Sequence, residues 1–296
     1  MRKEVVKNTT LLSIILLVMA MLSGCLGQGE GEFLGKIVQK GSDTMVILQQ
    51  KWAEVYMLEH PEVIIEVSGG GSGTGIAALI NGTCDIANSS RKIKEKEIAN
   101  ARENEIDPFE IRVAMDGIAV VVHPSNPVKN LSTAELEGIF TGEIENWSEV
   151  GGEDHEIVLY GRQSNSGTYV FFKEQVLEGK DYSPKTQELA GSAALAQAIS
   201  QEKYGIAYFG IGYVKQREDV KAISVNGIEP TDENISSGRY PISRFLYLYT
   251  NSKPQGILLE YIKWILSSEG QNLVLKVGYV NLSQSVLEEE LAKLGI

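Results

Sequence analysis

Four stretches of this chain place serine, threonine and glycine residues where a helix is expected to begin. They are residues 41–44, 69–75, 89–91 and 162–168. A helix N-terminus presents unpaired backbone N–H groups and the positive end of the helix dipole. Glycine lets the backbone come close to a ligand, and serine or threonine adds a hydroxyl donor. This repetition predicts a cage of hydrogen-bond donors around a small oxyanion.

The stretch that begins at Arg162 gives the strongest signal. An arginine can donate two parallel hydrogen bonds to an oxyanion, and Ser166, Gly167 and Thr168 then open a predicted helix that supplies further donors. Plainer interpretations stay open. Ser166 would only cap its helix while Arg162 forms a surface ion pair, and Arg91, after the third stretch, would pair with a nearby glutamate.

The glycine-rich stretch, residues 69–75, joins a predicted strand to a predicted helix. No Lys-Ser/Thr pair follows it, so it is not a Walker A phosphate loop, and it is not a clean dinucleotide-binding motif either. We expect Ser72 and the N–H groups at the start of the following helix to donate to the anion. A flexible loop without a ligand is the alternative.

Two aspartates, Asp43 and Asp116, accompany the predicted donors. A carboxylate beside an anion is unfavourable unless the anion carries a proton, as hydrogen phosphate does and sulfate does not. We therefore expect Asp116 to accept that proton, with Asp43 as the second candidate. The alternatives are a cap on the next helix for Asp43 and a turn with Gly117 for Asp116.

The N-terminal residues have the layout of a secretory signal, because basic residues precede an apolar run, residues 11–22, that is short for a membrane-spanning helix. The run ends in Leu-Ser-Gly-Cys at Cys25, which resembles the lipobox of bacterial-type lipoproteins. This predicts a signal peptide over residues 1–24, a lipidated tether over 25–35, and attachment of Cys25 to the outer face of the cytoplasmic membrane. A signal anchor, or a cleaved signal with an incidental cysteine, is the alternative.

The formal net charge of −12 argues against binding of nucleic acid. It does not argue against an anion site, because local dipoles and arginines act at contact distance while distant carboxylates are screened within about 8–10 Å. The three histidines and two cysteines show no metal-ligand spacing, so no metal and no other cofactor is predicted. Cys84 is expected to be a small buried core residue.

Strands and helices alternate along residues 33–296, which predicts a parallel α/β sheet with small-ligand loops at the carboxyl ends of its strands. The expected elements include a helix over residues 76–81, a strand over 118–123 and a helix over 186–201. Sheet-forming segments cross near residues 115–117 and 244–246. We therefore predict a first lobe made of 36–115 and 247–296, a second lobe of 116–246, and two connecting strands.

Taken in order, the four stretches, the Asp-Gly at 116–117 before an apolar strand, and the Gly-Arg-x-x-x-Ser-Gly-Thr at 161–168 resemble the phosphate-binding protein of the phosphate ABC importer. The resemblance covers most of the chain after Cys25. It implies an α/β fold of the two-lobed periplasmic-binding-protein type (type II), with each lobe a sheet flanked by helices and a two-strand hinge between them. It further implies a non-enzymatic protein, expected to be a monomer, that encloses inorganic phosphate and delivers it to a membrane permease.

Carried over position by position, the resemblance implies that the phosphate donors are Thr44 with its neighbouring backbone at Ser42 and Met45, Ser72, Arg162, Ser166, Gly167 and Thr168. Ser90, Arg91 and Asp116 complete the predicted site. Where some family members have an aspartate after the third strand, this chain has Ser90 followed by Arg91. The carboxylate role is therefore assigned to Asp116.

Two other functions compete with phosphate capture. One is a receptor for another oxyanion, namely sulfate, molybdate or tungstate. The other is a serine hydrolase or phosphatase with Ser164 or Ser166 as nucleophile. The hydrolase is disfavoured because the sequence lacks the Gly-x-Ser-x-Gly elbow, no histidine follows His155 at a suggestive position, and no metal-ligand set is evident.

Overall fold

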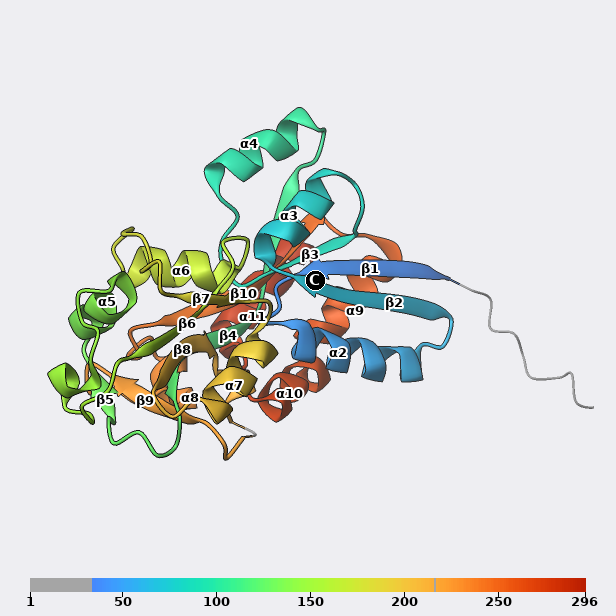
Figure 1. Ribbon diagram of the computed structural model, residues 1–296. Helices are drawn as coiled ribbons and strands as arrows, with labels where there is room; N and C mark the ends of the chain where they lie inside the picture. Colours follow the sequence, from blue (N-terminus) through green and yellow to red (C-terminus); the bar gives the residue numbers. More distant parts are fainter. Residues whose placement is uncertain (1–33, 216) are drawn as a thin grey trace, which may run out of the picture. The chain divides into compact units, whose positions relative to one another are not determined.

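The computed structural model describes residues 34–215 and 217–296, so Cys25 and the predicted signal segment lie outside the described residues. The unit Gly35–Ile296 is built from strands that alternate with helices (Figure 1). In these two ranges, no helix has both the length and the apolar character needed to cross a membrane.

Ten strands of the described residues form one hydrogen-bonded network in the order β2-β1-β3-β10-β4-β8-β6-β7, and β9 links β5 to β4. β1 runs parallel to β2 and β3, and β6 runs parallel to β7 and β8, whereas β4 and β10 run antiparallel to their neighbours. The strand bounds are β1 (Gly35–Gly41), β2 (Val63–Gly70), β3 (Ile86–Ser89), β4 (Pro108–Val122), β5 (Asn130–Leu131), β6 (Val158–Arg162), β7 (Gln187–Leu189), β8 (Gly205–Gly210), β9 (Lys221–Val225) and β10 (Ser243–Asn251).

The helices pack in two groups on this network. In one group α2 and α3 contact β1–β3, α9 and α10 pack on α2, and α11 packs on α9; in the other, α6, α7 and α8 contact β6, β8 and β4. The helix bounds are α2 (Val46–Glu59), α3 (Ser72–Ile80), α4 (Glu95–Glu103), α5 (Thr133–Thr141), η2 (Trp147–Val150), α6 (Gly167–Gln175), α7 (Ser192–Gln201), η3 (Ile211–Tyr213), α8 (Asp232–Ser236), α9 (Gly256–Leu266), α10 (Ser268–Val277) and α11 (Gln284–Leu294).

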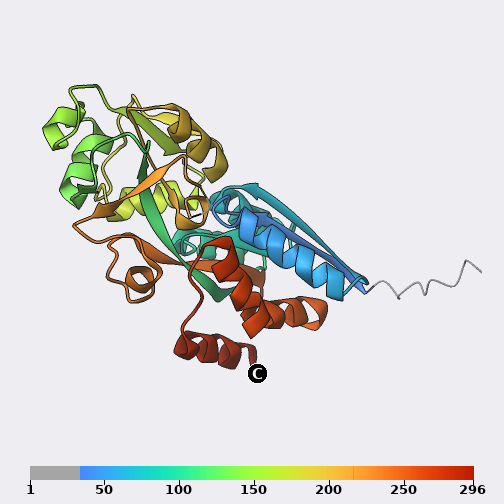
Figure 2. The ribbon, with the colours of Figure 1, turned by 90° about the horizontal axis from the view of Figure 1, so that it is seen from below.

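β4 and β10 run from one group of elements toward the other, as Figures 1 and 2 show from two sides. Residues 108–117 of β4 pair with β10, and residues 118–122 pair with β8, their last three also with β9. The two crossing segments predicted from the sequence, 115–117 and 244–246, both lie in these strands. Asp116 and Arg244 are direct partners in the register.

Three elements differ from the sequence-based expectation. The helix expected at 76–81 begins four residues earlier at Ser72, because Gly71, at φ 92°, makes the turn out of β2 and lets the glycine-rich stretch form the first helical turn. The strand expected at 118–123 begins at Pro108, since its N-terminal part pairs with β10 and, at Met115, also with Val280. The helix expected at 186–201 is instead β7 followed by α7, with Gly191 at φ 85° between them.

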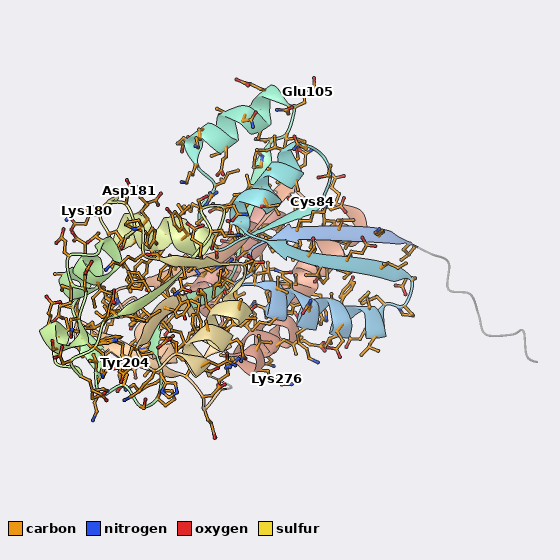
Figure 3. The ribbon with its side chains drawn as sticks, viewed as in Figure 1. Cys84, Glu105, Lys180, Asp181, Tyr204 and Lys276 are labelled. Atoms are coloured by element: carbon orange, nitrogen blue, oxygen red, sulfur yellow. The ribbon has the colours of Figure 1, made fainter. Side chains whose placement is uncertain are left out.

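Cys84 is half-buried rather than fully buried, beside α3 (Figure 3). Its Sγ lies 3.8 Å from the carbonyl oxygen of Gly75. Burial raises the pKa of the Cys84 thiol to about 12, so the thiol is protonated at neutral pH. Cys84 therefore behaves as a small packing residue.

Candidate functional site

The loops after β1, β2 and β3 lie at the carboxyl ends of neighbouring parallel strands. Ser42 and Thr44 follow β1, Ser72 opens α3 after β2, and Ser90 follows β3. At most 2% of each of these residues is exposed. Four hydroxyl groups are thus buried at one edge of the sheet, as the strand–loop–helix pattern predicts.

The fourth loop, at the start of α6, meets the other three. Gly167 lies so close to α3 that a Cβ atom there would stand 2.3 Å from Ser72 Oγ and 2.7 Å from Ser90 Oγ. Only glycine fits such an approach. Thr168 Oγ1 lies 2.8 Å from Thr44 Oγ1, and the Ser72 and Ser90 hydroxyl oxygens are 3.3 Å apart. The structure therefore brings all four predicted stretches together.

The hydroxyls of Ser166 and Ser42 each have a proton that is not used in a hydrogen bond within the described residues. Ser166 Oγ accepts hydrogen bonds from the N–H groups of Thr168 (3.2 Å) and Tyr169 (3.4 Å), so it caps α6 and its own proton is left over. Ser42 Oγ is buried without a hydrogen-bond partner in the described residues. A buried polar group without a partner is costly, and a bound oxyanion would satisfy both hydroxyls.

Arg162 forms an ion pair with Asp43. Its Nη2 donates to Asp43 Oδ2 at 2.5 Å and its Nη1 donates to Ser192 Oγ at 3.2 Å, while Nε is buried without a partner. Burial lowers the pKa of Arg162 and Asp43 opposes that shift. Each terminal nitrogen donates one of its two N–H groups in these contacts, so the predicted pair of bonds from Arg162 to a ligand stays a prediction. Asp43 Oδ1 accepts from the Gly70 N–H at 2.8 Å, so it is not a plain cap of α2.

Arg91 pairs with a glutamate, which was the alternative to phosphate binding in the sequence analysis. Its two terminal nitrogens donate to the two carboxylate oxygens of Glu97 at 2.8 and 2.7 Å. Burial alone would raise the pKa of Glu97, but hydrogen bonds from Arg91 and the Lys94 N–H, with the charges of both, hold it below its usual value. Arg91 thus anchors the start of α4 to the loop after β3.

Asp116 has different surroundings from those expected. Its Oδ2 accepts from Arg244 Nε at 3.1 Å and Nη2 at 2.8 Å, and its Oδ1 accepts from the Ile211 N–H at 3.1 Å. None of its surface is exposed. Burial raises the pKa of Asp116 while Arg244 opposes that shift. Arg244, at the matching position of β10, and the Ile211 N–H thus each engage one oxygen of Asp116, and the role of this carboxylate as acceptor of the phosphate proton stays a prediction.

The charges of the site are balanced in pairs. Arg162, Arg91 and Arg244 each face a carboxylate of their own, and each arginine is at most 6% exposed. Anion binding at this place would rest on hydroxyl and N–H dipoles more than on net positive charge. This agrees with a chain whose formal charge is −12.

Two contacts across the site were not predicted from the sequence. Asn165, in the loop before α6, donates through Nδ2 to the Gly70 carbonyl at 2.9 Å and accepts, through its own carbonyl, from the Gly73 N–H at 2.9 Å. The Tyr213 hydroxyl donates to the Asp43 carbonyl at 2.7 Å.

Arg244 was also not predicted as a site residue. Its only signal was a basic residue at the start of an otherwise apolar, tyrosine-rich strand.

The three histidines contact residues outside this site. His60 contacts Glu62, His123 contacts Ser125, and His155 stacks on Tyr204. In the part of the chain that the structure describes, no group of three or more His, Cys, Asp or Glu residues could hold a metal ion. The arrangement can bind an oxyanion through many donors.

The comparisons with known proteins agree with this geometry. Residues 27–269 match the family described as the PBP superfamily domain. The chain is 36% identical over 283 residues to the phosphate-binding protein PstS of Pseudomonas aeruginosa, covering 88% of each chain. It is 31% identical to PstS of Bacillus subtilis, covering 93% of this chain and 94% of the other.

Solved structures give the same result. A structure from Clostridium perfringens, described as a phosphate ABC transporter substrate-binding protein with bound phosphate, has a TM-score of 0.77 and 30% identity, covering 84% of this chain and 100% of that one. An ABC-type phosphate transport receptor from Vibrio cholerae has a TM-score of 0.69 and 31% identity over 82% and 99% of the two chains. The chain has the two-lobed periplasmic-binding-protein fold and belongs to the PstS family of phosphate-binding proteins within the PBP superfamily.

Proposed function

We propose that this protein captures inorganic phosphate between its two lobes and delivers it to an ABC importer. The observation that carries the proposal is the meeting of Gly167 and Thr168 with Ser72, Ser90 and Thr44. These loops come from both predicted lobes, so an anion held there would bridge them. The relatives named as phosphate-binding proteins, and the related structure with bound phosphate, support the choice of ligand.

The ligand would be held by the hydroxyls and N–H groups already described. Ser42, Thr44 and the backbone at Met45 would donate from the loop after β1, Ser72 and Ser90 from the next two loops, and Ser166, Gly167 and Thr168 from the start of α6. Arg162 would donate through Nε, the nitrogen left without a partner. Arg91 would anchor the loop after β3 through Glu97, which holds both its terminal nitrogens. Its Nε, also buried without a partner in the described residues, would be a further donor.

Selection of phosphate over sulfate needs an acceptor for the phosphate proton. We assign this role to Asp43, the other of the two candidate carboxylates, which lies in the loop after β1. About 19% of its side chain is exposed, whereas Asp116 is fully buried behind Arg244. Each carboxylate oxygen has more than one lone pair, so Asp43 can accept from a protonated anion while it keeps Arg162.

The location follows from the N-terminal sequence. Lipidated Cys25 would hold the protein, through a tether that ends near Gly35, at the outer face of the cytoplasmic membrane. There it would act as a monomer that exchanges phosphate with the permease. The relatives are transport proteins, which supports binding without catalysis.

A calorimetric titration tests the proposal. The protein is first freed of bound anion by dialysis in phosphate-free buffer and then titrated with phosphate, sulfate, molybdate and tungstate in turn. We expect one phosphate per chain and much weaker binding of the others. Tighter binding of sulfate, molybdate or tungstate would overturn the ligand, and turnover of a phosphate ester by the same sample would overturn the non-enzymatic role.

A further inference from the structure

Arg244 connects the two crossing strands to the anion-binding loops. Its guanidinium is held by Asp116, because Nε and Nη2 both donate to Asp116 Oδ2. The same Nη2 donates to Thr168 Oγ1 at 2.9 Å. We propose that Arg244 is a positioning residue for the bound anion, and that Asp116 acts on the anion only through Arg244. This inference rests on the phosphate-binding function proposed above.

The hydrogen-bonding capacity of the groups fixes the direction of the Thr168 hydroxyl. A guanidinium has donors and no acceptor, whereas a hydroxyl has one proton and two lone pairs. Thr168 must therefore accept from Arg244, and its proton must point elsewhere. The other polar neighbour is Thr44 Oγ1, at 2.8 Å on the opposite loop. Arg244 thus leaves the Thr168 proton free to be donated, either to Thr44 Oγ1 across the 2.8 Å contact or to an oxyanion bound between the two loops.

The charge of Arg244 also strengthens that donor. A hydroxyl that accepts a hydrogen bond from a cation is polarised and becomes a better donor in its turn. The effect is large only where water is excluded, and Arg244 is 5% exposed while Thr168 is fully buried. Arg244 therefore affects the anion through Thr168. Its Nη1 is buried without a hydrogen-bond partner in the described residues, and a direct bond from Nη1 to the anion is the outcome that the double-mutant cycle below separates from action through Thr168.

Asp116 keeps this arrangement in place. Without its carboxylate, Arg244 would be a buried and unpaired charge, which is strongly unfavourable. The Ile211 N–H holds the other carboxylate oxygen, so Asp116 is fixed by a third element, η3. The pair joins β4, β10, η3 and α6, which are the elements that meet where the strands cross.

A double-mutant cycle tests the pathway from Arg244 through Thr168. We expect Arg244→Gln to weaken phosphate binding about 10- to 100-fold, because the loss of one charge-assisted hydrogen bond has an effect of that size. Thr168→Val should weaken it at least as much. The double variant should bind phosphate no more weakly than Thr168→Val alone, because the first change acts through the hydroxyl that the second removes. Losses that multiply would overturn the inference.

A second cycle tests Asp116. In the Arg244→Gln background, Asp116→Asn should have no further effect on phosphate affinity. A further loss there would mean that Asp116 acts on the anion directly. Should Arg244→Gln fail to fold, both cycles are run with Arg244→Lys, which keeps the charge and loses the fork. Parental affinity in Arg244→Lys would also overturn the inference.

The matched control is Arg112→Gln. Arg112 lies on β4, the strand of Asp116, and pairs with Glu289 and with the buried Glu290, so its loss removes a similar ion pair away from the loops. We expect parental phosphate affinity. A comparable loss in this variant would show that the Arg244 effect is general destabilisation. Failure of the parental protein itself to bind phosphate would instead reject the proposed function.

Discussion

Arg162, the last residue of β6, and Asp43, in the loop that follows β1, form an ion pair of 2.5 Å. Arg162 is 2% exposed, and Asp43 also accepts the Gly70 N–H. The pair holds the two loops together across the site while leaving the Arg162 Nε free. One residue thus serves the contact between the loops and is ready to donate to an anion.

Loss of Arg162 should harm phosphate binding more than loss of Arg91. We expect Arg162→Ala to weaken binding by about 10- to 100-fold or more, since one charge-assisted bond contributes about 1.5–3 kcal/mol. Arg91→Ala should lower the thermal stability and have a smaller effect on affinity, because Glu97 occupies its terminal nitrogens. Calorimetric titration of both variants, each with a melting curve, decides the ranking. A larger affinity loss in Arg91→Ala would reverse it.

Asp43 should control discrimination against sulfate. A site with mispaired buried polar groups can reject an analogue by about 10⁴–10⁵-fold. We expect Asp43→Asn, which supplies a donor, to weaken phosphate and admit sulfate. Asp116→Asn should weaken both anions and leave their ratio nearly unchanged. Phosphate titrations with and without excess sulfate measure the ratio. If only Asp116→Asn narrows it, Asp116 is the selective carboxylate.

Asn165 should hold the loops together without contacting the anion. Its side chain donates to the Gly70 carbonyl and to Thr74 Oγ1, and each such bond contributes about 0.5–1.5 kcal/mol. We expect Asn165→Ala to weaken phosphate several-fold and to reduce the compaction that small-angle scattering detects when phosphate is added. Gln163→Ala, at an exposed position of the same loop, is the control. Equal compaction in both variants would exclude this role.

Stability below neutral pH should depend on Glu97. The pKa of this carboxyl is held below its usual value of about 4.3. Its contribution is therefore complete above that value and is lost as the pH falls through the lower pKa of the folded protein. Glu97→Gln should be less stable at about pH 6 and lose less stability toward about pH 3. Melting curves at both pH values test this, with the exposed Glu95→Gln as control. Parallel curves for Glu97→Gln and the parent would contradict it.

Membrane attachment should depend on Cys25. Each buried CH₂ of an acyl chain contributes about 0.8 kcal/mol, so a multiply acylated cysteine anchors stably. We expect Cys25→Ser to release the protein into the soluble fraction and Cys84→Ser to leave it with the membrane. Fractionation of cells that make each variant measures this. Cys25→Ser protein that stays membrane-associated would rule out the lipid anchor.

The sequence by itself determined the parts of the site that are local. Loops with Ser42, Ser72 and Ser90 follow neighbouring strands because apolar strands and polar turns alternate along the chain, and parallel strands end at one edge. The cap at Ser166 is local too, since its hydroxyl accepts from N–H groups within three residues. These features need only short-range periodicity and the hydrogen bonds of helix ends.

The tertiary structure alone decided which charges meet. Asp116 and Arg244 are far apart in the chain, and they become neighbours only through the register of β4 with β10. Strand register depends on burial and pairing over the whole sheet, which a single sequence does not specify at one position. The same holds for Arg162 with Asp43 and for Asn165 with the glycine-rich stretch. The sequence could show that Asp116 lies where strands cross, but only the folded chain shows that an arginine already occupies its carboxylate.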